Sequence, residues 1–203
     1  NENKLTKITY SQDHYIEISG YDDYGNPNLL CEYNLCDSKT TQEMKNIVLT
    51  FEKANRLKKY GNISFEYDEQ GTRIRKQNEN ILHKYYYHLG KLIKEQVVDI
   101  NENIVIRELV FIYGSSGITG FKLDDKVYYY LKDLTGLIIG LYNEEGKIVV
   151  NYVYDAWGNH KVYNELMFDI QSSEFIGNIN PFRYRGYYYD VETQLYWVSS
   201  RYY

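Results

Sequence analysis

Three residue types that shape many folds are scarce in this chain of 203 residues, which has 2 prolines, 2 methionines and 2 cysteines. Two cysteines exclude a disulfide-rich scaffold, and no further ligand clusters near Cys31 and Cys36 to complete a zinc site. We interpret both thiols as reduced structural side chains. A disulfide across the short loop between them stays open at the level of sequence.

Long apolar runs and excess positive charge are also absent. No stretch of about 18 apolar residues occurs, so the sequence predicts no membrane span. The net charge of −5 argues against nucleic acid as a partner. We interpret the basic cluster Arg73, Arg75 and Lys76 as a solvated strand face. No signal peptide is visible and the chain starts at Asn1, so we expect a segment of a longer protein.

A catalytic constellation is missing as well. The four histidines, His14, His83, His88 and His160, are scattered, and His83 and His88 lie in a sequence typical of a strand. No Ser-His-Asp order, phosphate-binding glycine loop or metal motif occurs. The sequence therefore predicts a segment that is not an enzyme, with no catalytic residue, no cofactor and no metal.

Tyrosine, in contrast, is abundant, with 25 residues. Its ring packs while its hydroxyl reaches water or the backbone, which favours a wide, twisted and partly solvated β surface. We therefore expect an all-β fold. Two stretches, residues 38–46 and 165–177, have the pattern of short helices that leave the sheet.

A repeated unit supports this fold class: a strand that ends in Tyr-Asp, a turn with glycine, and a second strand. The aspartate can accept backbone N–H groups as the strand ends, and glycine can adopt the positive φ that a short hairpin needs. We interpret these residues as hairpin devices rather than catalytic groups. They are Tyr21, Asp22, Tyr67, Asp68, Gly71, Tyr154, Asp155, Trp157 and Gly158.

The spacing between repeats is irregular, which favours hairpins of varied loop length stacked along one long curved or coiled sheet over a solenoid of fixed period. Divergent repeats occupy residues 1–123, and a denser pattern occupies residues 124–203. The densest run, NPFRYRGYYYDVETQLYWVSSRYY at 180–203, predicts a hairpin in which residues 187–189 and 195–198 are the strands and 190–194 the turn. Arg183, Arg185 and Arg201 are expected to stack on neighbouring rings.

This run resembles the core signature of Rhs proteins. They form the YD-repeat family, which also includes the shell-forming component of insecticidal Tc toxins and the shell of teneurins. The resemblance extends upstream through YYYLKDLTGLIIGLYNEEGKIVVNYVYDAWGN at 128–159. Its motif residues are structural: Asn180, Pro181, Phe182, Arg183, Tyr184, Arg185, Gly186, Tyr187, Tyr188, Tyr189, Asp190, Arg201, Tyr202 and Tyr203. The family usually has glycine where this chain has Gln194, which puts the turn type there in doubt.

The resemblance implies a long β-sheet coiled into a hollow shell that encloses a C-terminal toxin. In the family an autoprotease segment follows the RYY motif, which places it after Tyr203. It also implies a secreted or cell-surface bacterial protein whose partners are the rest of its own shell and the enclosed toxin domain. The alternative is a tyrosine-rich adhesion module that binds cell-surface glycans. A segment of such a sheet is expected to associate through its edges, or to cover them with its own residues.

Overall fold

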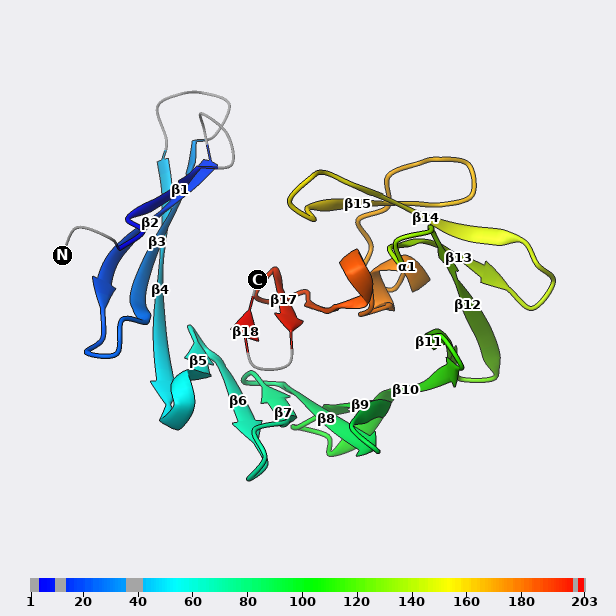
Figure 1. The fold of residues 1–203 in the computed structure, drawn as a ribbon, viewed down its shortest axis with the longest axis horizontal. Helices are drawn as coiled ribbons and strands as arrows, with labels where there is room; N and C mark the ends of the chain where they lie inside the picture. Colours follow the sequence, from blue (N-terminus) through cyan, green and yellow to red (C-terminus); the bar gives the residue numbers. More distant parts are fainter. Residues whose placement is uncertain (1–3, 10–13, 36–41, 199–200, 203) are drawn as a thin grey trace. The chain divides into compact units, whose positions relative to one another are not determined.

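The computed structural model describes residues 4–9, 14–35, 42–198 and 201–202, and these residues are mostly antiparallel strands (Figure 1). The all-β fold class expected from the sequence is confirmed. The chain divides into two compact units, Asn1–Asn80 and Ile81–Tyr203. Among the described residues, no helix is long and apolar enough to cross a membrane.

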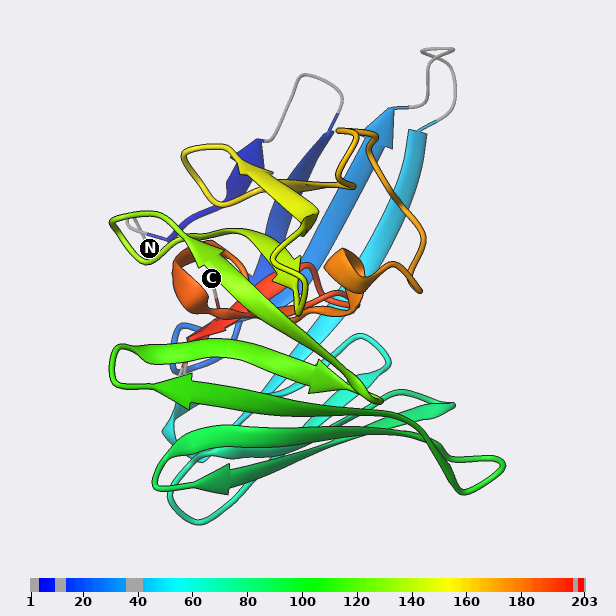
Figure 2. The ribbon, with the colours of Figure 1, turned by 90° about the vertical axis from the view of Figure 1, so that its right-hand side faces the viewer.

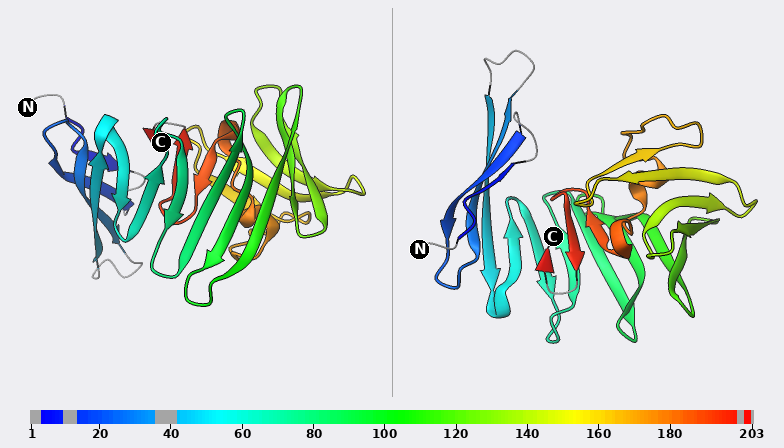
Figure 3. Two further views of the ribbon diagram at one scale, coloured as in Figure 1. Left: turned by 90° about the horizontal axis from the view of Figure 1, so that it is seen from below. Right: turned by 45° about the horizontal axis from the view of Figure 1, so that its top comes forward.

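In the first unit, each strand pairs antiparallel with the next one along the chain. Figure 3 shows β1 to β4 side by side in one twisted ribbon. A short 3₁₀ turn, Lys53–Asn55, joins β4 to β5. The strands are β1 (Lys7–Thr9), β2 (His14–Tyr21), β3 (Pro27–Leu35), β4 (Gln42–Glu52), β5 (Arg56–Tyr60), β6 (Ile63–Tyr67) and β7 (Arg73–Gln77).

The helix predicted at residues 38–46 is wrong for the part that the structure describes. Residues 42–46 belong to strand β4, whereas residues 38–41 and Cys36 lie outside the described residues. The strand continues into Ile47 and Leu49, which are buried at 3% and 7% exposure, while Val48 between them is 56% exposed. This period of two belongs to a strand with one buried face, and it overrides the weak helix-start signal at Ser38 or Thr40.

The basic cluster of β7 also differs from the sequence interpretation. Arg75 is exposed and pairs with Glu66 (3.1 Å), but Arg73 and Lys76 are buried at 0% and 3% exposure. The cause is a register shift between β6 and β7, where Glu66 faces Arg75 and Tyr67 faces Arg73. The extra residue places Arg73 and Lys76 on one face together, and the Arg73 guanidinium lies over the Phe65 ring at 5.6 Å.

In the second unit, eight strands again pair in chain order. Figure 2 shows the strands from β8 onward as long, twisted neighbours. The division at residue 124 concerns sequence pattern, falls between β11 and β12, and stays a prediction. The strands are β8 (Ile81–His88), β9 (Lys91–Asp99), β10 (Ile104–Gly114), β11 (Gly117–Leu123), β12 (Lys126–Lys132), β13 (Ile138–Asn143), β14 (Ile148–Tyr154) and β15 (His160–Tyr163).

The C-terminal segment of this unit lies within the curve of its strands (Figure 1). It holds the helical turn α1 (Ile176–Ile179), the 3₁₀ turn η2 (Tyr184–Gly186), and β16 (Tyr188–Asp190), β17 (Leu195–Val198) and β18 (Arg201–Tyr202). The helix predicted at 165–177 is wrong except at its last two residues. Residues 165–175 form turns and one bridge, because Asn164 caps a tight turn and Asp169 pairs with Tyr163.

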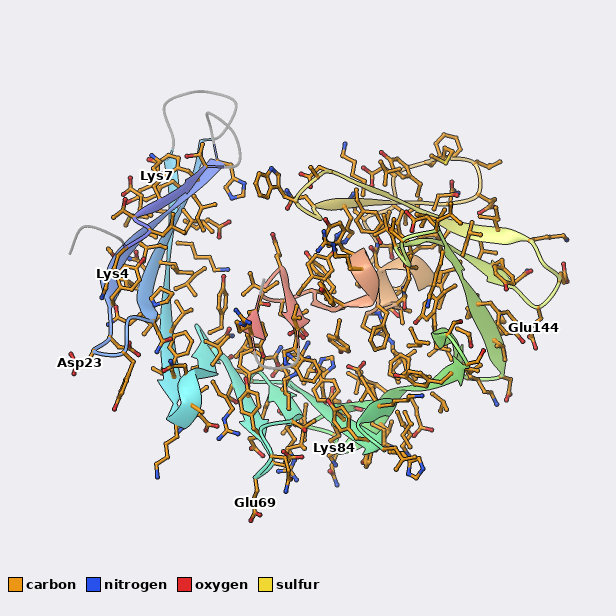
Figure 4. All side chains as sticks on the ribbon, in the orientation of Figure 1. Lys4, Lys7, Asp23, Glu69, Lys84 and Glu144 are labelled. Carbon is orange, nitrogen blue, oxygen red and sulfur yellow. The ribbon has the colours of Figure 1, made fainter. Side chains whose placement is uncertain are left out.

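The core of the second unit lies between the sheet and this segment. Phe121, Ile138, Leu141 and Val150 are fully buried. The neighbouring side chains on each strand face the other way, so Lys84 of β8 and Glu144 beyond β13 point away from the segment (Figure 4). The edge of β15 is covered by the chain itself, because Ile170 donates its N–H to the Val162 carbonyl (2.9 Å). A bare strand edge is thereby avoided.

Candidate functional site

The Tyr-Asp turns are one group of residues that the sequence singles out. At Asp155, Oδ1 accepts the backbone N–H groups of Trp157 (2.8 Å) and Asn159 (2.9 Å). Gly158 donates its N–H to the Asp155 carbonyl (3.2 Å) and has a φ of 91°, a conformation in which glycine carries no steric cost. The carboxylate therefore replaces the strand partners that the backbone loses as it turns.

The turns at Asp22 and Asp68 repeat this arrangement. Asp22 Oδ1 accepts from Tyr24 (3.0 Å) and Asn26 (2.8 Å), and Asp68 Oδ1 accepts from Thr72 (2.8 Å). The Asn26 side chain is the main cause that lowers the pKa of Asp22, and the Asn159 side chain does the same for Asp155. Both carboxylates are held ionised as acceptors of turn hydrogen bonds.

The tyrosine of each pair reaches back to the preceding part of the sheet. Tyr67 of β6 donates its hydroxyl to the Leu57 carbonyl of β5 (2.8 Å), and Tyr154 of β14 donates to the Ile138 carbonyl of β13 (2.7 Å). Tyr21 donates to the Leu5 carbonyl. Burial raises the pKa of Tyr154, so its donor proton is retained. Tyrosine thus fixes the strand and aspartate fixes the turn that follows.

Three further turns of the same kind are formed by Asp133, Asn143 and Asn164, residues that the sequence analysis did not single out. Their side-chain oxygens accept the backbone N–H groups of the residues two and four positions later, at distances of 2.8–3.1 Å. A hydrogen bond from Thr135 is the main cause that lowers the pKa of Asp133. The available signal was Asp or Asn followed three residues later by glycine, which holds for Asp133 and Asn143, whereas Asn164 has Met167 there.

A buried polar network around Asn180 holds the start of the NPFRYRG run. Asn180 is fully buried, and its Oδ1 accepts the Tyr130 hydroxyl (2.9 Å). Its Nδ2 lies 3.1 Å from the Tyr152 hydroxyl and donates to the Phe182 carbonyl (2.6 Å). Burial raises the pKa of Tyr152 to about 12. One amide therefore joins strands β12 and β14 to the segment that they cover.

Arg183 extends this network in several directions. Its Nε donates to the Asn180 carbonyl (3.1 Å), and its Nη2 donates to the Asn178 carbonyl (2.9 Å). The guanidinium carbon lies over the Tyr189 ring at 4.7 Å, and Nη1 contacts His160 Nε2. Arg183 is 2% exposed. A planar cation with several donors suits this site better than lysine.

His160 is neutral in this arrangement. Burial, reinforced by the Arg183 charge, lowers its pKa to about 3. Its Nε2 is then the acceptor for Arg183, which leaves Nδ1 as the donor to the Tyr196 hydroxyl (3.1 Å). Tyr196 in turn donates to the Gly158 carbonyl (3.0 Å). The chain of hydrogen bonds thus ends on the turn of the YDAWGN motif.

The two C-terminal motifs also pack directly on each other. A Cβ atom on Gly158 would lie 2.9 Å from the Tyr184 ring, whose hydroxyl donates to the Ala156 carbonyl (3.3 Å). Trp157 stays 76% exposed at the turn. Arg185 adopts a φ of 53°, and its guanidinium carbon lies 5.3 Å from the Tyr184 ring centroid.

The C-terminal hairpin forms as expected, but its first strand is β16 (Tyr188–Asp190) rather than residues 187–189, so Asp190 belongs to the strand and not to the turn. Tyr189 faces Tyr196, Tyr188 faces Trp197, and Gln194 closes the turn by donating its N–H to the Asp190 carbonyl (2.8 Å). Gln194 has a φ of 58°, the conformation that favours glycine. Among the remaining motif residues, the Pro181 carbonyl accepts the Tyr189 N–H (2.7 Å), and Phe182 packs edge-on against Phe111. Gly186 is the last residue of η2, and Tyr187 follows it. Arg201 and Tyr202 form β18, and Tyr203 lies outside the described residues.

The hydrogen bonds of this site hold the C-terminal segment on the sheet. Within the part of the chain that the structure describes, no three His, Cys, Asp or Glu side chains are grouped so that they could hold a metal ion. The polar groups around Asn180 satisfy one another or the backbone. Tyr130, Tyr152, His160 and Tyr196 complete the network, although the sequence did not link them to Asn180 or Arg183.

Comparison with known proteins identifies the family to which this chain belongs. No protein-family model matches the chain. The tRNA nuclease WapA of Bacillus subtilis (strain 168) is 28% identical over 235 aligned residues, which cover 99% of this chain and 10% of that protein. The tRNA(Glu)-specific nuclease WapA of Bacillus subtilis subsp. natto (strain BEST195) is 31% identical over 141 residues, 69% of this chain and 6% of that protein. WapA is an Rhs/YD-repeat toxin. The chain belongs to the Rhs/YD-repeat family.

The Rhs/YD-repeat fold is seen in a solved structure as well. The crystal structure of TcdB2-TccC3-TEV matches with a TM-score of 0.57 at 13% identity, covering 94% of this chain and 12% of that one. At this identity the match shows a shared fold alone. The Rhs/YD-repeat chain spans about a tenth of the length of the first two curated relatives.

Proposed function

We propose that this chain is a structural shell segment of an Rhs toxin and that the shell encloses a toxin domain carried further along the same polypeptide. The observation that supports the proposal most is the fastening of the C-terminal segment. In the second unit, Asn180 and Arg183 hold that segment on the buried face of the sheet through hydrogen-bond contacts to Tyr130, Tyr152 and His160. Further hydrogen bonds of these two residues brace the segment itself.

Enclosure follows from the physics of such a sheet. Side chains alternate between two faces, so one face can pack inward while the other stays charged and solvated. Phe121 and Leu141 are fully buried on the inward face, whereas Gln96 and Glu108 form an outer hydrogen bond (2.6 Å). Each buried large side chain contributes about 1.5–3 kcal/mol. A wall of many such residues resists opening and keeps proteases from a guest.

The proposed role is not enzymatic. The names of the WapA relatives describe nucleases, and we assign that kind of activity to a domain outside this segment. The partners are then the remainder of the shell and the enclosed domain. As a toxin of this family, the whole protein is secreted or held at the cell surface.

A protease-protection experiment on the full-length protein tests this function. The shell is expected to protect the C-terminal domain from added protease under native conditions. Asn180→Ala removes the shared amide and leaves the buried Tyr130 hydroxyl without its acceptor, so it should cost about 3 kcal/mol and speed digestion of that domain. Asn62→Ala, in the exposed turn between β5 and β6, is the matched control and should leave the rate unchanged.

Two outcomes would count against the proposal. One is digestion of the C-terminal domain as fast in the intact protein as in that domain expressed alone. The other is equal protection in the wild type and in Asn180→Ala after chemical denaturation has verified that the variant is destabilised.

A second function, adhesion to glycans, has one observation in its favour. Tyr24 and Trp157 occupy the same position of two Tyr-Asp turns and are 83% and 76% exposed. Exposed rings of this kind stack on sugars. Glycan binding lost in Tyr24→Ala and Trp157→Ala, and kept in Leu134→Ala, would favour adhesion. No binding by the wild type would exclude these rings as the glycan site.

A further inference from the structure

Strand β10 extends beyond its neighbour β11 and leaves part of one edge open. It begins at Ile104, and β9 pairs with it from that residue onward. On the other side, β11 pairs with β10 only from Leu109 to Gly114. Among the described residues, no strand therefore pairs with residues 104–108 on the side away from β9. An edge of this kind presents backbone N–H and C=O groups with which another strand can pair.

The side chains at the start of this open edge are apolar. Ile104, Val105 and Ile106 are 47%, 51% and 50% exposed. The register with β9 shifts between Val105 and Arg107, so Ile106 is the extra residue of a bulge and has no counterpart on β9. β-Branched residues favour strand pairing, and exposed apolar residues that are contiguous mark interaction sites. The open edge is thus suited to an apolar strand.

The two charged residues that follow do not protect this edge. Charged side chains commonly keep an edge strand from pairing. Here Arg107 Nη2 donates to both carboxylate oxygens of Glu174 (3.2 and 3.3 Å). Glu108 Oε2 accepts from Gln96 (2.6 Å) and lies 3.5 Å from Lys94 Nζ. Both charges are therefore engaged within their own molecule, which leaves the apolar run beside them accessible.

We propose that two copies of this chain pair edge to edge through residues 104–106 as antiparallel strands. A two-fold axis at Val105 sets this residue opposite itself and sets Ile104 opposite Ile106 of the second copy, so the apolar run is its own complement. Leu82, Val98 and Val105 already face one another across β8, β9 and β10. The same row of apolar pairs continues across the axis into the second copy.

The size of the contact determines its strength. Two edges of three residues each fall at the low end of specific interfaces, below about 1,200 Å² of buried surface. The dimer is therefore weak and depends on protein concentration. Its formation does not depend on the proposed enclosure of a toxin.

Sedimentation velocity of the whole chain over a concentration series tests the pairing. We expect monomer at low concentration and dimer at high concentration. Ile106→Lys places two like charges beside the axis and should weaken the dimer by about a hundred-fold. Val110→Lys is the matched control, because Val110 is 38% exposed on the same strand but is flanked by both β9 and β11. It should leave the dissociation constant unchanged.

Three results would overturn the proposal. The first is a wild type that stays monomeric at every concentration. The second is a dimer that Ile106→Lys leaves as stable as in the wild type, because another surface would then form the contact. The third is equal weakening by Ile106→Lys and Val110→Lys, which would assign association to the face of the sheet rather than to its edge.

Hydrogen exchange of the wild type locates the contact without any variant. Amides 104–106 should exchange more slowly at the concentrations where the dimer forms, whereas amides 110–112, which lie between two strands in the monomer, should keep their rates. Protection of amides 104–106 that is the same at low and high concentration would contradict pairing between copies through this edge.

Discussion

At the scale of single residues, two structural roles recur in this protein. In both, a side chain forms hydrogen bonds with the backbone. Asp155 and Asn143 close turns by accepting backbone N–H groups, and Tyr154 holds a neighbouring strand by donating to a carbonyl. Asparagine performs the turn role as well as aspartate, so negative charge is not what the position requires. Turn closure and strand attachment therefore account for the Tyr-Asp pair as a structural unit, and no catalytic role is needed to explain it.

The pH dependence of stability provides a residue-scale prediction for His160. Its folded pKa of about 3 lies below the unfolded value near 6.5, so its contribution is present above pH 6.5 and is lost as the pH falls toward 3. The free energy of unfolding should drop by up to about 1.4 kcal/mol per pH unit in that window. Urea denaturation at several pH values measures this slope.

His160→Gln is the matched variant for this measurement. Glutamine can still accept a hydrogen bond from Arg183 but does not titrate. Its free energy of unfolding should depend less on pH between 6.5 and 4 than that of the wild type. If the free energy of unfolding depends on pH equally in the wild type and in His160→Gln, burial of a neutral His160 is not the cause of that dependence. The turn aspartates whose pKa is lowered, Asp22, Asp133 and Asp155, affect stability only below their unfolded value near 3.9.

At the scale of elements, hairpins are the unit of construction, and the sequence shows them with uneven clarity. Turns with Asp and Gly, such as that of Asp155 and Gly158, could be predicted because their chemistry is local. The helix expected at 38–46 could not be corrected without the partner strands, since the period of Ile47 and Leu49 begins after it. The burial of Arg73 depends on a register shift that no local pattern reveals.

One hairpin turn departs from the others and provides an element-scale prediction. Met167 has a φ of 61° at the position where the other five turns of this kind in the described part of the chain have glycine. A side chain in this conformation costs about 1 kcal/mol. Met167→Gly should therefore raise the free energy of unfolding by up to about 1 kcal/mol. A higher thermal midpoint than that of the wild type would show this gain.

Leu166→Gly is the control, because Leu166 is similarly exposed but is not among the residues with positive φ. It should bring no gain. A Met167→Gly variant that is less stable than the wild type would mean that Met167 contributes packing that outweighs its backbone strain.

At the scale of the whole molecule, only one side of the candidate site could be predicted from the sequence. The NPFRYRG run identified one side of the network, since Asn180 and Arg183 lie in a dense and unusual motif. The other side comes from Tyr130, Tyr152 and His160 on three strands, and only the packing of those strands brings the groups together. Long-range contacts of this kind have no local signature, which is why the partners escaped notice.

Electron cryomicroscopy of the full-length protein tests the central claim most directly. We expect this stretch to form part of the wall of a closed β shell, with density for a further domain inside it and with residues 176–198 held on the inner face. A further domain seen outside the wall, in contact with solvent, would contradict the claim that the shell encloses a toxin.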